Sequence, residues 1–155
     1  MKTLILGMGN PILSDDGVGI RVAEELEGRL SPQEAVVMET SMAGLGLLDL
    51  LTGYDRAIII DAILTSEGEA GQIYRLTPDS FDNTLHATSP HDVSLTTALE
   101  LGKRLGMALP RQIIIFAIQA SDITTFSEEC TPDVKQAIPA CVEMVIKELS
   151  RNNNS

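Results

Sequence analysis

Residues 56–61 read Arg-Ala-Ile-Ile-Ile-Asp, a nearly all-apolar run typical of a strand buried on both faces of a parallel sheet. Residues 112–118 form a second run of this kind. Periodicity predicts further strands at 3–7, 36–40 and 71–76, and helices at 17–30, 43–51, 92–106 and 131–149. Residues 71–76 alternate, which predicts a half-exposed edge strand, whereas residues 77–90 have no clear period and are predicted to form a long connection.

Strands that alternate with helices predict an α/β fold. Right-handed crossovers place successive helices over both faces of such a sheet, so we expect a three-layer sandwich. Its centre is a mostly parallel, twisted sheet of about five strands. The chain has 155 residues, which suits one domain at residues 1–150 and a polar tail at residues 151–155. The loops after the carboxyl ends of the strands should carry the function.

The charge of the chain excludes several classes of partner. It has 11 Lys and Arg against 22 Asp and Glu, a net charge of −11, which repels nucleic acid and anionic membrane surfaces. No apolar run approaches the roughly 20 residues needed to span a bilayer, and no basic leader precedes the first strand, so we expect a cytoplasmic protein. Aromatic residues make up only 3% of the chain, which favours a monomer.

A glycine-rich segment lies between the first strand and the first helix. Residues 7–19 read Gly-Met-Gly-Asn-Pro-Ile-Leu-Ser-Asp-Asp-Gly-Val-Gly. The third glycine of a dinucleotide-binding fingerprint is replaced by Ile12, and the Lys of a P-loop is absent. Asp15 and Asp16 would also repel a phosphate. We expect Ser14 or Asp15 to cap the helix, and because one cap does not need two aspartates, Asp16 is a candidate for another role.

Two further candidates follow other predicted elements. Asp61 comes directly after a central strand, where a carboxylate must reach solvent, pair or bind a cation, unless it only forms a turn. Residues 89–92, Ser-Pro-His-Asp, predict a helix start with Ser89 as N-cap and Pro90 in the first position. His91 then lies in the first turn, where the helix dipole favours a neutral imidazole that can bind a metal.

The predicted fold brings Asp16, Asp61 and His91 from three loops to one end of the sheet. Two carboxylates and one imidazole suit an open transition-metal site, and they also suit general acid and base catalysis. No serine lies in a Gly-x-Ser-x-Gly setting, and Cys130 and Cys141 lack metal or redox spacing, so we expect both to be reduced bystanders.

An ordered set of motifs resembles the hydrogenase maturation endopeptidases, which trim the large subunit of nickel-iron hydrogenases. The motifs are Gly7-Met-Gly-Asn-Pro11 with Asp15-Asp-Gly-Val-Gly19, Ala43-Gly-Leu-Gly46, Ile60-Asp-Ala62 with Gly71-Gln-Ile-Tyr74, and His91-Asp-Val-Ser-Leu95. The resemblance extends from Met1 to about Leu149. It implies a cytoplasmic endopeptidase that removes a C-terminal peptide from the large-subunit precursor after nickel has been inserted.

The resemblance also implies roles for particular residues. The two acidic residues and the histidine that contact nickel in this family match Asp16, Asp61 and His91, although the family often has Glu in place of Asp16. His91 is preferred to His86 because the Asp-Val-Ser-Leu stretch follows it. The nickel belongs to the substrate, so the resting enzyme is expected to carry none. A water polarised by a carboxylate or by the metal is expected to attack the peptide bond.

Two other functions are alternatives to this one. Peptidyl-tRNA hydrolases share a Gly-x-Gly-Asn-Pro segment, but they need a basic surface and a histidine soon after it, where this chain has Asp15 and Asp16. A nickel-sensing chaperone that binds the precursor through the same three residues, without cutting it, stays open. We expect substrate specificity to lie in surface loops such as residues 77–90 and 119–130.

Overall fold

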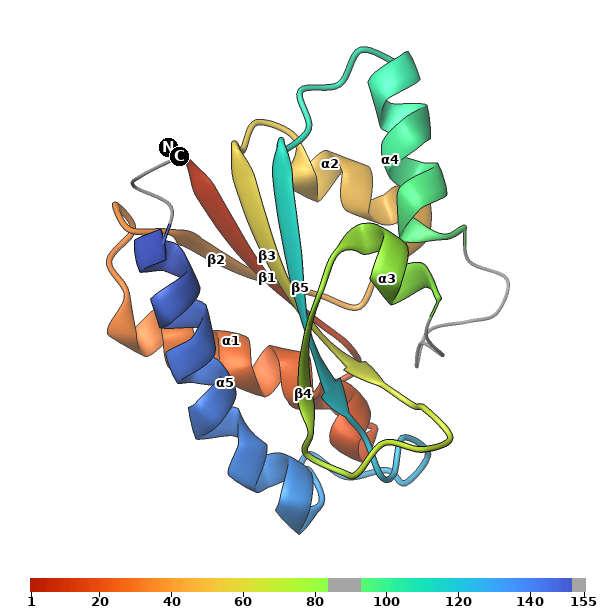
Figure 1. The fold of residues 1–155 in the computed structure, drawn as a ribbon. Helices are drawn as coiled ribbons and strands as arrows, with labels where there is room; N and C mark the ends of the chain where they lie inside the picture. The colour runs from red at the N-terminus through yellow and green to blue at the C-terminus, as the bar shows by residue number, and fades with distance from the viewer. Residues whose placement is uncertain (84–92, 152–155) are drawn as a thin grey trace.

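The computed structural model describes residues 1–83 and 93–151 and contains one five-stranded sheet (Figure 1). The strands are β1 (Thr3–Met8), β2 (Val36–Thr40), β3 (Arg56–Ile63), β4 (Ile73–Leu76) and β5 (Gln112–Gln119). Their order is β2-β1-β3-β5-β4, with β4 antiparallel to β5 and every other pair parallel. The mostly parallel sheet and the edge position of residues 71–76 confirm the prediction.

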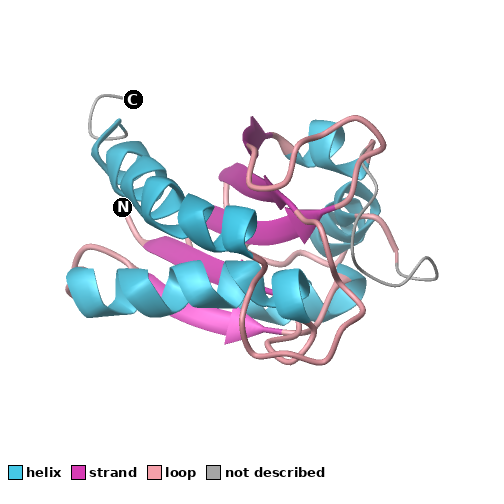
Figure 2. Ribbon diagram, turned by 90° about the horizontal axis from the view of Figure 1, so that it is seen from below, coloured by secondary structure: helices cyan, strands magenta, loops and turns pink. Residues whose placement is uncertain are grey.

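Helices cover both faces of the sheet (Figure 2). On one face lie α1 (Val18–Arg29) and α5 (Pro132–Ser150), and on the other α2 (Leu47–Leu51), α3 (Pro78–Asp82) and α4 (Leu95–Arg104). Alternation along β1 supplies both cores, because Ile5 packs under α1 and α5 while Leu4 and Leu6 pack on the opposite side. The three-layer α/β prediction is confirmed. None of the helices in the described ranges is long and apolar enough to cross a membrane.

The stretch predicted as a connection contains a short helix, α3. Thr77 is its N-cap and accepts a hydrogen bond from the Ser80 N–H at 3.4 Å, and Pro78 opens the helix. Phe81 anchors α3 in the core cluster on that face of the sheet. The predicted long connection at residues 77–90 thus begins with a helix that its sequence pattern did not indicate. Residues 84–92 lie outside the described residues, as do residues 152–155 of the predicted tail.

Helix α4 begins at Leu95, three residues later than predicted. Its N-cap is Ser94, whose hydroxyl accepts a hydrogen bond from the Thr97 N–H at 3.2 Å, so Ser89 is not the N-cap of this helix. Asp82 at the end of α3 accepts from the N–H groups of Leu95 and Thr96 at 3.0 and 2.9 Å. His91 precedes this N-cap in the sequence, so it does not belong to the first turn of α4 as predicted, and it lies outside the described residues.

A network of charged side chains closes the amino end of the sheet. Arg56 is 4% exposed and donates to the hydroxyl of Thr3 at 3.1 Å and to the carbonyl oxygen of Glu148 at 3.2 Å. The carboxylate of Glu148, also 4% exposed, accepts two hydrogen bonds from Arg75, at 2.7 and 3.0 Å. This network holds the C-terminal end of α5 against β3 and β4.

Candidate functional site

Glycines after β1 allow two backbone segments to approach each other closely. A Cβ atom on Gly9, whose φ is +140°, would lie 1.9 Å from the carbonyl oxygen of Asp16. A Cβ atom on Gly19 would lie 2.2 Å from the carbonyl oxygen of Ile60 in β3. Any larger residue at either place would collide with backbone, so these glycines serve close packing. They bring the turn that carries Asp16 to the carboxyl end of β3.

Asp16 belongs to a short 3-10 turn, Ser14–Gly17, and is half-buried. Its Oδ2 accepts a hydrogen bond from the Asn10 N–H at 2.9 Å. Burial raises the pKa of Asp16 above its ordinary value, although the Asn10 N–H acts in the opposite direction. The carboxylate is thus partly removed from water and has one backbone donor in this loop.

Asp61 lies inside β3 and is 1% exposed. Its Oδ1 accepts a hydrogen bond from the Ala62 N–H at 2.8 Å, but its Oδ2 has no partner among the described residues. Burial raises the pKa of Asp61 well above its ordinary value, and the negative charge of Asp16 raises it further. A buried carboxylate in this state must hold a proton or meet a cation.

The structure therefore brings two of the three predicted site residues together. The turn that carries Asp16 packs against β3, and the charge of Asp16 is one of the causes that raise the pKa of Asp61. His91, like His86, lies outside the described residues. Within residues 1–83 and 93–151, no three His, Cys, Asp or Glu side chains gather in a metal-binding cluster. The described part of the chain thus contributes a pair of carboxylates.

The first described residue after residues 84–92 lies at the same end of the sheet. A Cβ atom on Gly44, in the loop after β2, would be 3.0 Å from the carbonyl oxygen of Val93. Asp61 lies on the same face of β3 as Ile59 and Ile63, which belong to the core cluster covered by α2, α3 and α4. The chain therefore resumes on the side of the sheet toward which Asp61 points.

Asp15 does not cap α1, contrary to the prediction. The N-cap of α1 is Gly17, which makes no side-chain cap. Asp15 is instead fully buried and accepts hydrogen bonds from the N–H groups of Ser121 and Asp122 at 2.9 Å and of Thr131 at 2.7 Å. Its partners follow it by 106 to 116 positions, so no local sequence signal indicates this role.

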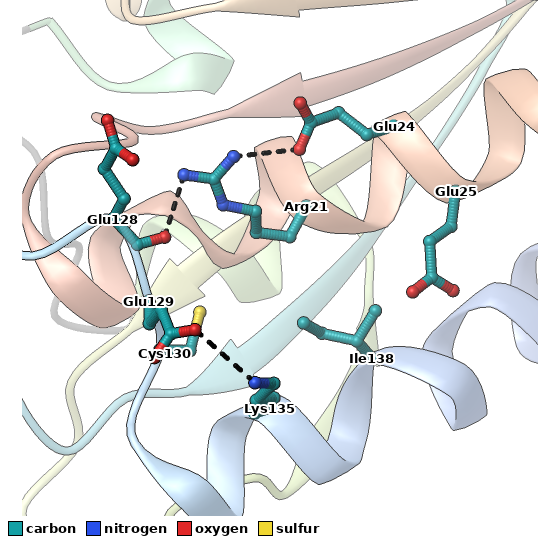
Figure 3. Close-up of a pocket in the computed structure, with 8 residues that line it drawn as sticks. All are labelled: Arg21, Glu24, Glu25, Glu128, Glu129, Cys130, Lys135 and Ile138. Carbon is teal, nitrogen blue, oxygen red and sulfur yellow. Dashed lines mark hydrogen bonds and ion pairs between the residues drawn. The ribbon is translucent and has the colours of Figure 1, made fainter.

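A cavity of about 400 Å³ lies nearby, between α1, α5 and residues 128–130 (Figure 3). Neither Asp16 nor Asp61 lines it. Arg21 reaches across one side of this cavity and donates to the carbonyl oxygens of Pro11 and Glu128, at 3.1 and 2.9 Å. The cavity is thus separate from the carboxylate pair, although Arg21 connects the same two segments of the chain that Asp15 connects.

Both cysteines are free. Burial raises the pKa of Cys130 to about 11, with the nearby charge of Asp15 as the next largest cause, and burial raises the pKa of Cys141 to about 12. Thiols with such pKa values carry little thiolate at neutral pH. This agrees with the prediction that neither cysteine is a nucleophile.

Comparisons with known proteins identify the family. Residues 20–148 match the family model HycI, described as hydrogenase maturation protease. This chain belongs to the hydrogenase maturation protease family. The matched range includes Asp61 and His91 and begins just after Asp16. The chain is accordingly a hydrolase of the endopeptidase class.

Individual relatives extend the similarity over the whole chain. The hydrogenase 2 maturation protease of Escherichia coli is 29% identical over 154 residues, which cover 96% of this chain and 91% of the relative. The solved structure of the hydrogenase maturating endopeptidase HybD from E. coli superimposes with a TM-score of 0.83 at 28% identity, covering 99% of this chain and 94% of that one. HybD from Thermococcus kodakarensis, with a TM-score of 0.71 at 24% identity over 96% and 99% of the two chains, shares the fold.

Proposed function

We propose that this maturation protease removes a C-terminal peptide from the nickel-loaded precursor of a nickel-iron hydrogenase large subunit. Family membership supports the reaction class. The Oδ2 of Asp61, which has no partner in the described part of the chain, supports the recognition of a cation together with Asp16. Proteins pair nearly all of their buried polar atoms, so an unpaired carboxylate oxygen next to a second carboxylate favours a ligand role.

Asp16, Asp61 and His91 together would contact the nickel. Two carboxylate oxygens and one imidazole nitrogen leave positions open for the ligands that the precursor itself supplies. Val93, two positions beyond His91 in the sequence, lies at the end of the sheet that carries the carboxylates, which supports adding His91 to the set. The metal enters with the substrate, and we expect the resting enzyme to hold none.

The carboxylate pair also provides a physical reason for selecting a loaded precursor. Without a cation, burial and the charge of Asp16 oppose ionisation of Asp61 and favour its protonated form. A bound cation reverses this preference, since it stabilises both carboxylates and displaces the proton. A precursor without nickel brings no cation for these two carboxylates to bind, and it would therefore bind more weakly at this end of the sheet.

Hydrolysis would use a water polarised by a carboxylate of the pair or by the nickel of the substrate. The water oxygen bonds to the carbonyl carbon of the scissile peptide, and the carbon–nitrogen bond breaks. The proton released from water passes through a carboxylate to the leaving amine.

Intact-mass measurement tests the proposal directly. Nickel-loaded and nickel-free large-subunit precursor are each incubated with the unaltered protein and with His91→Ala. We expect a C-terminal fragment to be lost only from the loaded precursor and only with the unaltered protein. Equal cleavage of both precursors would overturn nickel recognition. Nickel-dependent binding with no change in mass would favour the chaperone alternative.

A further inference from the structure

We propose that Asp15 is a positioning residue, whose buried carboxylate fastens residues 121–131 to the turn Ser14–Gly17 and so fixes Asp16 beside Asp61. The importance of Asp16 in this proposal rests on the proposed function. The geometric part, that Asp15 sets the place of Asp16, is independent of any reaction and has its own test.

The carboxylate of Asp15 is surrounded by donors from one segment of the chain. Oδ1 accepts from the Thr131 N–H at 2.7 Å, and Oδ2 accepts from the N–H groups of Ser121 and Asp122 at 2.9 Å. The hydroxyl of Thr131 reaches both oxygens, at 3.1 and 2.8 Å. Four donors on a fully buried carboxylate form a strong connection, because hydrogen bonds to charged acceptors are the stronger kind.

Main-chain hydrogen bonds join the same two segments beside this carboxylate. The Asp15 N–H donates to the carbonyl oxygen of Asp122, and the Ser14 N–H donates to that of Ser127, both at 2.9 Å. The Ser127 N–H in turn donates to the carbonyl oxygen of Ile12 at 2.9 Å. Residues 12–15 and 121–131 thus form one connected unit at the carboxyl end of the sheet.

The turn benefits from such a connection because, despite local hydrogen bonds such as that from the Asn10 N–H to Asp16, its backbone is strained and uncapped. Ser14 has a φ of +52°, in the left-handed region that non-glycine residues rarely adopt. The turn lacks a side-chain cap, and so does α1, which follows it directly. A strained and uncapped turn holds its shape only where the surrounding structure imposes it. The bonds of Asp15 supply that constraint one residue away from Asp16.

The position of Asp16 matters because its partner cannot adjust. Asp61 is fixed within β3, between the paired strands β1 and β5, so the geometry of the carboxylate pair depends on the turn. The hydrogen bond from the Asn10 N–H to Oδ2 of Asp16 reports where this carboxylate lies. A displaced turn would lengthen that hydrogen bond and separate the two carboxylates.

The amide signal of Asn10 in a ¹H–¹⁵N NMR spectrum provides a test without substrate. Asp16→Asn, which removes the charged acceptor, defines the direction of the signal's shift. We expect Asp15→Asn to shift the signal in the same direction, because an amide group cannot accept from all four donors. Asp122→Asn is the matched control. Its carboxylate organises the same segment through Thr124 and Thr125, whereas its main-chain groups make the contacts with Asp15. It should leave the Asn10 signal in place.

Single-turnover and steady-state cleavage of nickel-loaded precursor provide the second readout. Asp15→Asn should lower kcat about 10- to 100-fold with little change in KM, since a small misplacement of a reacting group has effects of that size. Glu143→Gln, on the exposed side of α5 where its carboxylate pairs with Arg29, should keep kcat within about twofold. If Asp15 only stabilised the fold, a folded Asp15→Asn protein would keep both its Asn10 signal and its kcat.

A milder pair of variants covers the case in which Asp15→Asn does not fold. Thr131→Val removes the hydroxyl donor and keeps the three N–H donors, so it should shift the Asn10 signal and kcat in the same directions by smaller amounts. Thr131→Ser restores the hydroxyl and should restore both. An unmoved Asn10 signal in folded Asp15→Asn or in Thr131→Val overturns the positioning role. A shifted signal, with a precursor that even the unaltered protein leaves intact, supports the positioning role and overturns the proposed function.

Discussion

At the amino end of the sheet Arg56 and Glu148 are buried with partners, whereas at the carboxyl end Asp61 is buried and its Oδ2 has no partner within residues 1–83 and 93–151. The pKa values differ in the same way. Hydrogen bonds from Arg75 are the largest cause of a lowered pKa at Glu148, while burial and the charge of Asp16 raise the pKa of Asp61. The amino end stabilises the ionised form of Glu148, and the carboxyl end destabilises the ionised form of Asp61.

The difference separates a structural charge from a functional one. This fold can satisfy a buried carboxylate, as Glu148 demonstrates, so the deficit at Asp61 is specific to its location. Groups placed for binding or catalysis are often kept in states that cost stability, and the cost is recovered when the ligand arrives. Changing each carboxylate in turn should therefore have opposite effects on stability, and only one of the two changes should affect cleavage.

The largest expected effect is the loss of cleavage in Asp61→Asn. The amide keeps the shape of the side chain but cannot supply a negative charge to nickel or accept a proton from water. We expect the single-turnover rate on nickel-loaded precursor to fall by about 1000-fold or more. Glu148→Gln, at the other end of the sheet, should cleave at the unaltered rate while it is folded. Substantial cleavage by folded Asp61→Asn would show that the unpartnered carboxylate is incidental.

The next effect in size concerns stability at the amino end. Glu148→Gln removes the charged acceptor of the hydrogen bonds from Arg75 and the attraction between the Glu148 carboxylate and the charge of Arg56. We therefore expect the free energy of unfolding, measured by urea denaturation, to fall by about 2 kcal/mol. Arg75 is 41% exposed, and its solvation keeps the loss at this modest level. The control is Glu143→Gln on the same helix, where both partners of the ion pair with Arg29 are exposed and the loss should stay below about 0.5 kcal/mol. Equal losses in the two variants would mean that burial of Glu148 contributes nothing.

Much of the fold followed from the pattern of the sequence. Apolar runs such as residues 56–61 predict buried parallel strands because a strand covered on both faces needs apolar side chains on both. Helix α3 was missed because it has one turn and depends on Phe81 packing beneath it. The start of α4 was misplaced because both Ser89 and Ser94 resemble caps, and the tertiary contact that accompanies Ser94 comes from Asp82.

The order of strands and helices predicted where the site lies, but not which hydrogen bonds its residues make. Asp16 and Asp61 were expected together because the carboxyl ends of neighbouring parallel strands meet at one end of a sheet, and the turn that carries Asp16 does pack against β3. The different fates of Asp15 and Asp16 could not be predicted, since adjacent carboxylates look alike in sequence. The partners that separate them are Asn10 for one and the distant Thr131 for the other.

The smallest expected effect is a gain of stability in Asp61→Asn, opposite in sign to the loss expected in Glu148→Gln. The pKa of Asp61 is higher in the folded protein than in the unfolded chain. The contribution of this protonation to the free energy of unfolding is therefore fully present below the ordinary aspartate pKa, and it is lost as the pH rises through the pKa of the folded protein. The asparagine variant does not titrate, so above that range it should be more stable than the unaltered protein by about 1 kcal/mol.

The pH dependence separates charge from packing as the origin of that gain. Urea denaturation near neutral pH and near the ordinary aspartate pKa should show the advantage of Asp61→Asn shrinking as pH falls. The stability lost in Glu148→Gln should also shrink as the pH falls. The pKa of Glu148 is lowered in the folded protein, so its ionised carboxylate stabilises the fold above the ordinary glutamate pKa, and this stabilisation is lost as the pH falls through the pKa of the folded protein. The two variants would then differ in sign at neutral pH and converge in acid. If the gain in unfolding free energy of Asp61→Asn stayed constant with pH, the gain would arise from packing. The charge of Asp61 would then not be what destabilises the unaltered protein.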